Sequence, residues 1–278
     1  MQEIINNQKG SNNTQIGEQN NHTENKNMVV HVETHSNTYM GASLEEVTKL
    51  VTNLFLDNFP RMQQIAKDTV EARINELWEN IVEKLSKEGI TNFSPFMEPD
   101  VQYVLYEAQK GYARFATNDM LANLSSLIAE RIKNDDGDMC LKVTIDQAIS
   151  IIPMLSSAQL DYLALQFLIT KVKFNNIHNL DDLKRHFEYL DATFSTAHIS
   201  NWQYLNMLGC LQLELPDICK ISAINYKLNI EDIKKICPKN FGILNGDYST
   251  SPIGTIIAII YAEQKTNYHF DPTIWIHN

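Results

Sequence analysis

The chain has 278 residues, which is enough for one large domain or two of ordinary size. It carries 23 Lys and Arg residues against 34 Asp and Glu residues, a formal net charge of −11, and 44% of its residues are hydrophobic. This composition is typical of a folded globular protein and excludes a wholly disordered chain or a membrane-embedded bundle. The acidic balance also argues against binding to nucleic acid or to anionic membranes, because both need clustered Lys and Arg.

The first 40 residues differ in composition from the rest of the chain. They contain nine Asn and four Gln but few apolar side chains, too few to offset the conformational entropy that is lost on ordering. We therefore expect residues 1–40 to be a disordered tail in an isolated molecule. Residues 1–10 contain no apolar run of the kind found in a secretory signal. This favours a cytoplasmic protein whose four cysteines are reduced thiols.

One short motif in this tail is the candidate functional segment. Residues Thr14–Asn20 resemble the Q-Φ-G-x-x-N core of RHIM-type amyloid signalling motifs. In stacked, in-register strands, Gln15 and Asn20 would form amide ladders. Ile16 would pack in a dry interface, and Gly17 would allow a tight turn. The resemblance implies self-assembly or templating through these four residues. The alternatives are a tail that only solvates the N-terminus, or a small β-layer closed within a defined oligomer.

Helical patterns dominate from residue 41 to residue 173. Ser43–Glu46 has the form of a capping box, and a second helix is expected after Pro60, with Gly89 as its C-terminal cap. Its predicted inward stripe comprises Ile74, Leu77, Trp78, Ile81, Val82 and Leu85. Further helices are predicted from Pro99, from Asn118, over 140–152 and from Ser156, where a second capping box occurs. Short connections between them predict antiparallel packing in a helical array.

The pattern is less regular from residue 174 to residue 278. Helices are expected at 179–192, 198–211, 229–237 and 253–265, and short extended pieces at Phe241–Leu244 and Thr273–Ile276. The apolar run from Ile253 to Ala262 is about half the length that a membrane span needs, so it predicts a buried helix. The overall prediction is a mostly α fold with three parts. These are the tail (1–40), a helical domain (41–173) and a smaller, mainly helical and winged-helix-like domain (174–278).

Two groups of residues contain the side-chain types that bind metal ions. The acidic turn 135–138 has no ligands at the other positions of an EF-hand loop, so it is interpreted as a turn. Cys210, Cys219 and Cys237 could bind zinc together with His198, but their spacings of 9 and 18 residues differ from those of zinc knuckles. They are interpreted as buried thiols. No metal and no cofactor is predicted.

Two other sets could carry chemistry. Asp100, Glu107 and Lys110 resemble a nuclease PD…ExK signature, but the last two are three residues apart on a predicted helix, so they would not share a metal. Asp182 and His186 are four residues apart and could share a proton or a metal, or form a plain surface pair. No nucleophile elbow, P-loop, zincin or Rossmann motif occurs. No catalytic residue is therefore predicted.

Several stretches of the body resemble an uncharacterised bacterial family with an Asn- and Gln-rich amino end and a helical body. They are Leu56–Phe59, Pro99–Lys110, Ala148–Ile149, Pro153–Leu155 and Gln203–Cys210. The resemblance covers most of the chain and implies the architecture, but it brings no activity with it. Together with the motif in the tail, it suggests bacterial immunity, including anti-phage defence.

The leading hypothesis is a non-enzymatic cytoplasmic interaction protein that binds a protein partner or itself through the N-terminal segment. One alternative is a helical effector or toxin that acts on a membrane through the helix at Ile253–Ile260. Another is a hydrolase whose site no motif reveals. DNA binding is disfavoured because residues 200–278 contain six Lys and no Arg. The sequence does not identify the partner, the trigger or the oligomer number.

Overall fold

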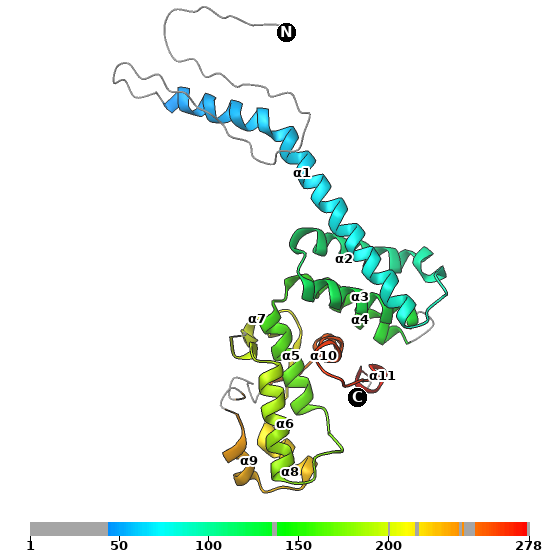
Figure 1. Ribbon diagram of the computed structural model, residues 1–278, viewed down its shortest axis with the longest axis vertical. Helices are drawn as coiled ribbons and strands as arrows, with labels where there is room; N and C mark the ends of the chain where they lie inside the picture. Colours follow the sequence, from blue (N-terminus) through cyan, green and yellow to red (C-terminus); the bar gives the residue numbers. More distant parts are fainter. Residues whose placement is uncertain are drawn as a thin grey trace, which may run out of the picture. The chain divides into compact units, whose positions relative to one another are not determined.

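The computed structural model describes residues 44–134, 138–199, 201–214, 217–238, 241 and 248–276. Within these ranges the fold is mostly α, as the sequence predicts, with eleven α-helices and one two-stranded sheet (Figure 1). The α-helices are α1 (Leu44–Lys87), α2 (Pro99–Phe115), α3 (Asn118–Lys133), α4 (Met139–Ile151), α5 (Ser157–Thr170), α6 (Leu180–Thr193), α7 (Trp202–Met207), α8 (Ile218–Tyr226), α9 (Ile230–Ile236), α10 (Pro252–Lys265) and α11 (Thr273–Ile276). Short 3₁₀ turns lie at Ser94–Met97, Ile152–Met154 and Ala197–Ile199.

The first helix differs from the prediction at its middle. We expected a break at Pro60, but α1 continues through this proline and has a total length of 44 residues. The chain divides into two units, Met1–Gln63 and Gln64–Asn278, and α1 belongs to both. After α1, Gly89 has a φ of +70°, the left-handed conformation that a glycine cap adopts. This end of the helix is therefore as predicted.

Only a narrow stripe of α1 is buried in the second unit. Leu77, Ile81 and Leu85 are buried, whereas Trp78 and Val82 are exposed, contrary to the wider stripe that we expected. The Trp78 ring instead makes an edge contact with Phe96, with ring centroids 5.6 Å apart. The prediction failed at these two positions because helical spacing does not say how wide a face the neighbouring helices cover.

Helix α10 forms the centre of the core. Its residues from Gly254 to Ala262 are all buried, and it packs against α4 and α5, which confirms the buried helix predicted for this run. A Cβ at Gly254 would lie 1.9 Å from the carbonyl oxygen of Cys210, so a glycine permits this close approach. Since α10 packs on α4 and α5, the two predicted body domains, 41–173 and 174–278, both contribute to the unit Gln64–Asn278.

The small sheet lies elsewhere than the expected extended pieces. Strands β1 (Leu211–Leu213) and β2 (Tyr248–Thr250) pair antiparallel, with Leu211 opposite Thr250. The segment Thr273–Ile276 is helix α11, so its predicted extended structure is wrong. The reason is local. Asp271 Oδ1 accepts a hydrogen bond from Thr273 N at 2.9 Å, and the helical turn begins at Thr273, directly after Pro272.

Of the other expected extended piece, Phe241–Leu244, only Phe241 lies within the described residues. None of the described helices contains an apolar stretch long enough to span a bilayer.

Candidate functional site

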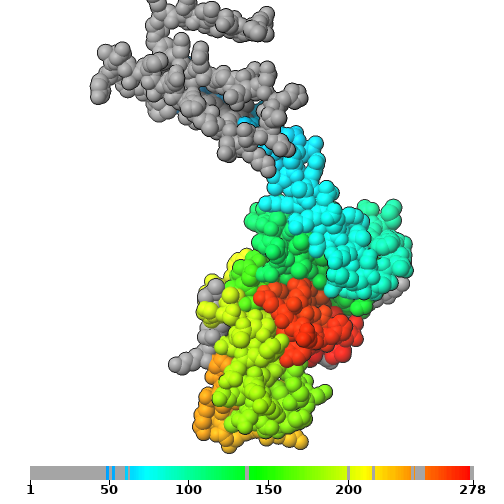
Figure 2. Space-filling view, in the orientation of Figure 1, coloured from blue at the N-terminus to red at the C-terminus, as the bar shows by residue number. Residues whose placement is uncertain are grey.

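The assembly motif predicted from the sequence, Gln15, Ile16, Gly17 and Asn20, lies outside the described residues. The described part of the chain offers another candidate, a cleft of about 880 Å³ in the unit Gln64–Asn278. Figure 2 shows the C-terminal segment, in red, at the surface against the green helices of residues 100–150. The cleft is lined by Lys84, Glu88, Ile90, Ser126, Glu130, Lys133, Asn134, Ile259, Ile260, Glu263, Gln264, Tyr268, His269, Phe270, Asp271, Pro272 and Thr273.

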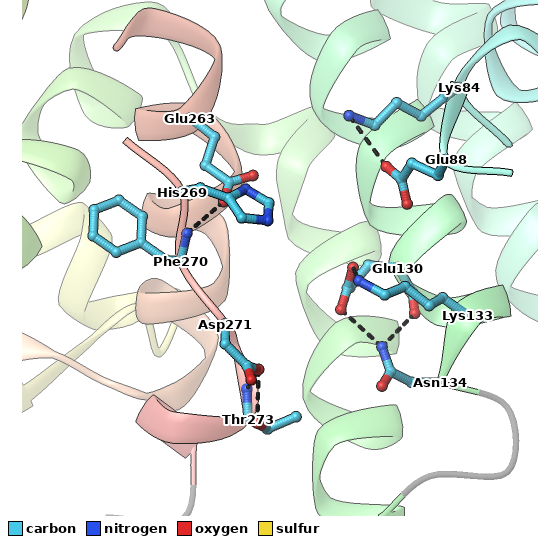
Figure 3. A network of polar contacts seen from close by, with 10 residues as sticks. All are labelled: Lys84, Glu88, Glu130, Lys133, Asn134, Glu263, His269, Phe270, Asp271 and Thr273. Atoms are coloured by element: carbon cyan, nitrogen blue, oxygen red, sulfur yellow. Dashed lines mark hydrogen bonds and ion pairs between the residues drawn. The ribbon is translucent and has the colours of Figure 1, made fainter. Parts of the chain in front are cut away.

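The first wall of the cleft comes from the ends of α1 and α3 (Figure 3). Lys84 Nζ lies 3.3 Å from a carboxylate oxygen of Glu88, and Lys133 Nζ lies 3.3 Å from one of Glu130. Asn134 follows α3, and its Nδ2 donates to Glu130 Oε1 at 2.8 Å. The last turns of two helices thus hold two carboxylates and two amines beside one another.

The second wall comes from the end of α10 and the segment 268–273 that returns past it (Figure 3). Glu263 Oε1 accepts a hydrogen bond from Phe270 N at 2.7 Å and lies 2.9 Å from His269 Nδ1. These contacts fix the returning segment to α10. Hydrogen bonds from Thr273 lower the pKa of Asp271 below its ordinary value, so this carboxylate is charged at neutral pH.

The charges of the cleft are arranged by depth. Glu130 exposes 11% of its side chain and Glu263 exposes 23%. By contrast, Lys133 exposes 54% and His269 exposes 90%. Glu130 and Glu263 therefore lie deeper in the cleft than Lys133 and His269, whereas Asp271 is exposed. With four carboxylates against two lysines, the cleft has a net negative charge at neutral pH, and a low-dielectric concave surface of one sign concentrates ligands of the opposite sign.

Asp100, Glu107 and Lys110, which resemble a nuclease signature in the sequence, take part in two separate interactions. Asp100 binds Arg131, whose guanidinium is buried between it and Asp146. Glu107 instead pairs with Lys110, at 2.7 Å. These carboxylates therefore serve separate ion pairs.

The pair Asp182 and His186 is also separated. Asp182 accepts hydrogen bonds from His178 N and from Arg185. His186 lies instead in an aromatic cluster, where burial lowers its pKa to about 4. The interpretation as a surface pair is therefore wrong for His186, because α6 turns it towards Phe174 and the core.

The cysteines lie in different surroundings. Cys210 is buried, and burial raises its pKa to about 12. His198 Nδ1 lies 2.6 Å from the backbone oxygen of Ser195. Cys219 and Cys237 are partly exposed, so the prediction of buried thiols is wrong for these two. Among the described residues, no group of three or more His, Cys, Asp or Glu side chains could hold a metal ion.

The sequence reasoning missed the cleft. Its residues come from positions near 84, 130 and 265, and no short motif links them. The only local signals were the charged residues at the ends of α1 and α3. Lysines are common there because the helix dipole favours cations at a C-terminus, so they do not by themselves indicate a site.

Comparison with known proteins identifies a family for this chain. Residues 41–246 match the model of an uncharacterised protein family. No curated protein and no solved structure matches the chain. The matched range begins where the Asn- and Gln-rich tail ends, and it covers most of the helical body. The chain therefore belongs to this uncharacterised family.

Proposed function

We propose that this protein is a non-enzymatic, cytoplasmic interaction protein whose helical body binds a basic segment of a protein partner in the cleft. The single observation that carries the proposal is the arrangement of charge in the cleft, where the carboxylates of Glu130 and Glu263 lie deeper than the ammonium of Lys133. An arginine or lysine entering the cleft would meet Glu130 and Glu263 at its floor. Carboxylates of the partner would meet Lys84 and Lys133 at the rim.

The composition of the lining favours a peptide segment over a small apolar ligand. Seven of the seventeen lining residues are Lys, Glu, Asp or His, whereas pockets for small molecules are lined mainly by apolar and aromatic side chains. The floor still offers Ile259, Ile260 and Phe270 for the aliphatic part of a long basic side chain. The site therefore suits a segment in which lysine or arginine alternates with small apolar residues.

The test uses a fluorescently labelled hexa-arginine peptide and fluorescence anisotropy at low salt. The double variant Glu88→Gln/Glu263→Gln removes two carboxylates from the cleft. Since each ion pair contributes up to about 1 kcal/mol, we expect binding to weaken roughly 5- to 30-fold. The matched control is Glu107→Gln/Glu231→Gln, which removes two carboxylates that pair with lysines elsewhere. Equal weakening by both variants would mean that the peptide only senses the net charge, and the cleft proposal would be lost.

The second part of the proposal concerns assembly. We propose that Gln15, Ile16, Gly17 and Asn20 mediate self-association, and that the protein acts in bacterial immune signalling, including anti-phage defence. This part is supported by the resemblance of Thr14–Asn20 to amyloid signalling motifs. Light scattering of the full chain beside a chain that begins at Gly41 tests it. We expect a large assembly only with the tail present, and its loss in Gln15→Ala/Gly17→Pro. A monomeric mass for every sample would contradict the assembly role.

Helix α1 gives this second part further support. In the unit Gln64–Asn278, the described side chains from Gln64 to Ala72 are exposed, including Ile65 at 55%. Helical segments without tertiary contacts are marginally stable in water. A helix that carries apolar side chains away from its own core is therefore suited to a contact with other molecules.

A further inference from the structure

The carboxylates of the cleft share one feature, which is that the chain already uses at least one oxygen of each (Figure 3). Glu263 Oε1 accepts a hydrogen bond from Phe270 N at 2.7 Å and lies 2.9 Å from His269 Nδ1. Asp271 Oδ1 accepts two hydrogen bonds from Thr273, one from N at 2.9 Å and one from Oγ1 at 2.7 Å. Since a carboxylate oxygen has two lone pairs, these two oxygens have no acceptor position left for a ligand.

The carboxylates of the facing wall are engaged as well. Glu130 Oε1 accepts a hydrogen bond from Asn134 Nδ2 at 2.8 Å, and its Oε2 lies 3.3 Å from Lys133 Nζ. Glu88 Oε1 lies 3.3 Å from Lys84 Nζ. Three of the four carboxylates each keep a second oxygen that has no hydrogen-bond or ion-pair partner among the described residues. None of the four therefore presents both of its oxygens to a ligand.

The two basic side chains of proteins use such acceptors differently. A guanidinium presents a planar fork of N–H groups, and its strong bidentate contact needs both oxygens of one carboxylate. An ammonium is a compact charge with three donors on a flexible stem, so it can bind single oxygens that belong to different carboxylates. A cleft that presents single oxygens is therefore better suited to an ammonium than to a guanidinium.

We propose, building on the proposed binding function, that the cleft binds lysine in preference to arginine in the basic segment of the partner. The second oxygens of Glu88 and Glu263, on the two facing walls, accept hydrogen bonds from the lysine ammonium. His269 and Thr273 determine this preference, because their side chains occupy acceptor positions that a guanidinium fork would need.

The two side chains that determine the preference can be removed without disturbing the wall that they belong to. His269 exposes 90% of its side chain, and Thr273 is also exposed. The hydrogen bonds from Phe270 N to Glu263 and from Thr273 N to Asp271 come from the backbone. They persist in any variant in which only the side chains are shortened, so the segment 268–273 stays fixed to α10.

The test measures the binding of labelled hexa-lysine and hexa-arginine peptides to the full chain by fluorescence anisotropy at the same low salt. We expect hexa-lysine to bind more tightly by up to about fivefold, which is the worth of one exposed ion pair. In His269→Ala/Thr273→Ala this preference should shrink, because Glu263 Oε1 and Asp271 Oδ1 each regain one acceptor position. Every carboxylate and lysine of the cleft remains in this variant.

The matched control removes a threonine and a histidine outside the cleft. In Thr193→Ala/His198→Ala the lost side chains contact the backbone oxygens of Tyr189 and Ser195, so the wild-type preference should remain. Circular dichroism checks that each variant folds. If the double variant in the cleft does not fold, His269→Ala alone replaces it and should narrow the preference by a smaller factor.

Three outcomes would overturn the preference for lysine. They are equal or tighter binding of hexa-arginine by the wild type, an unchanged preference in His269→Ala/Thr273→Ala, and a preference that persists in Glu88→Gln/Glu263→Gln. The first two leave the binding of a basic segment intact. If neither peptide binds, the proposed function itself fails and the preference fails with it, so the two failures are distinguishable.

Discussion

His186 should make the stability of the protein depend on pH. Its ring lies 4.2 Å from that of Phe174 and 6.4 Å from that of Tyr268, measured between centroids. Its Nε2 is buried and has no hydrogen-bond partner among the described residues. An imidazolium in this position would lose most of its hydration and gain no partner. Burial accordingly lowers the pKa of His186 to about 4.

The size and the sign of the effect follow from this pKa. In the unfolded chain the pKa of His186 is about 6.5, so between pH 6.5 and pH 4 the unfolded state binds the proton more tightly. The contribution of the neutral ring is fully present above pH 6.5 and is lost as the pH falls towards 4. At about 1.4 kcal/mol per pH unit, the total loss is about 3 kcal/mol.

Urea unfolding at a series of pH values from 7.5 to 4 measures this loss. In His186→Phe, which keeps an aromatic ring in the cluster, the free energy of unfolding should fall less steeply below pH 6.5 than in the wild type. His178→Gln removes an exposed imidazole just before the same helix and serves as the control. A constant difference between the wild type and His186→Phe over the whole pH range would refute this reasoning.

Three further predictions concern stability, and urea unfolding at pH 7.5 measures all of them. Leu77→Ala should lower the free energy of unfolding by about 2–5 kcal/mol because the side chain is buried. Ile65→Ala on the same helix should change it by less than about 0.5 kcal/mol. Equal losses would contradict the burial pattern of α1. Asp146→Asn leaves the buried guanidinium of Arg131 with one carboxylate fewer and should lower the free energy of unfolding by about 3 kcal/mol. An unchanged stability would show that this ion pair is dispensable. Gly254→Ala places a Cβ 1.9 Å from a backbone carbonyl oxygen and should lower the free energy of unfolding by about 1–3 kcal/mol. An unchanged free energy of unfolding would mean that α10 can shift.

Local signals in the sequence predicted the ends of several helices. Helix α2 begins at Pro99, whose fixed φ and missing N–H suit this position. Helix α5 begins after Ser156, whose backbone N–H donates to Gln159 Oε1 at 2.7 Å as a capping box requires. Helix α4 ends at Ile151, two residues before Pro153. Each of these ends depends on contacts within a few residues, which the sequence contains directly.

Features that depend on distant residues could not be predicted. Helix α8 was missed although six of its nine residues are hydrophobic, and it forms where Asp217 accepts a hydrogen bond from Lys220 N. The position of His186 depends on Tyr268, which lies about 80 residues further along the chain. The cleft arises in the same way, since helix packing sets the distances between its residues and sequence spacing does not.

Helix α10 combines the rigidity and the charge that the proposed binding role needs. Its residues Gly254 to Ala262 are buried, and the next residue, Glu263, reaches the cleft. Because α10 packs against α4 and α5, a movement of Glu263 would require the core to repack. The acidic wall is thus preformed, and a preformed site loses little conformational entropy when a flexible basic segment binds.

Binding to the folded state alone also stabilises it. A basic peptide at about 100 times its Kd should therefore raise the free energy of unfolding by about 2.7 kcal/mol, and by less in Glu88→Gln/Glu263→Gln, in proportion to the weaker binding.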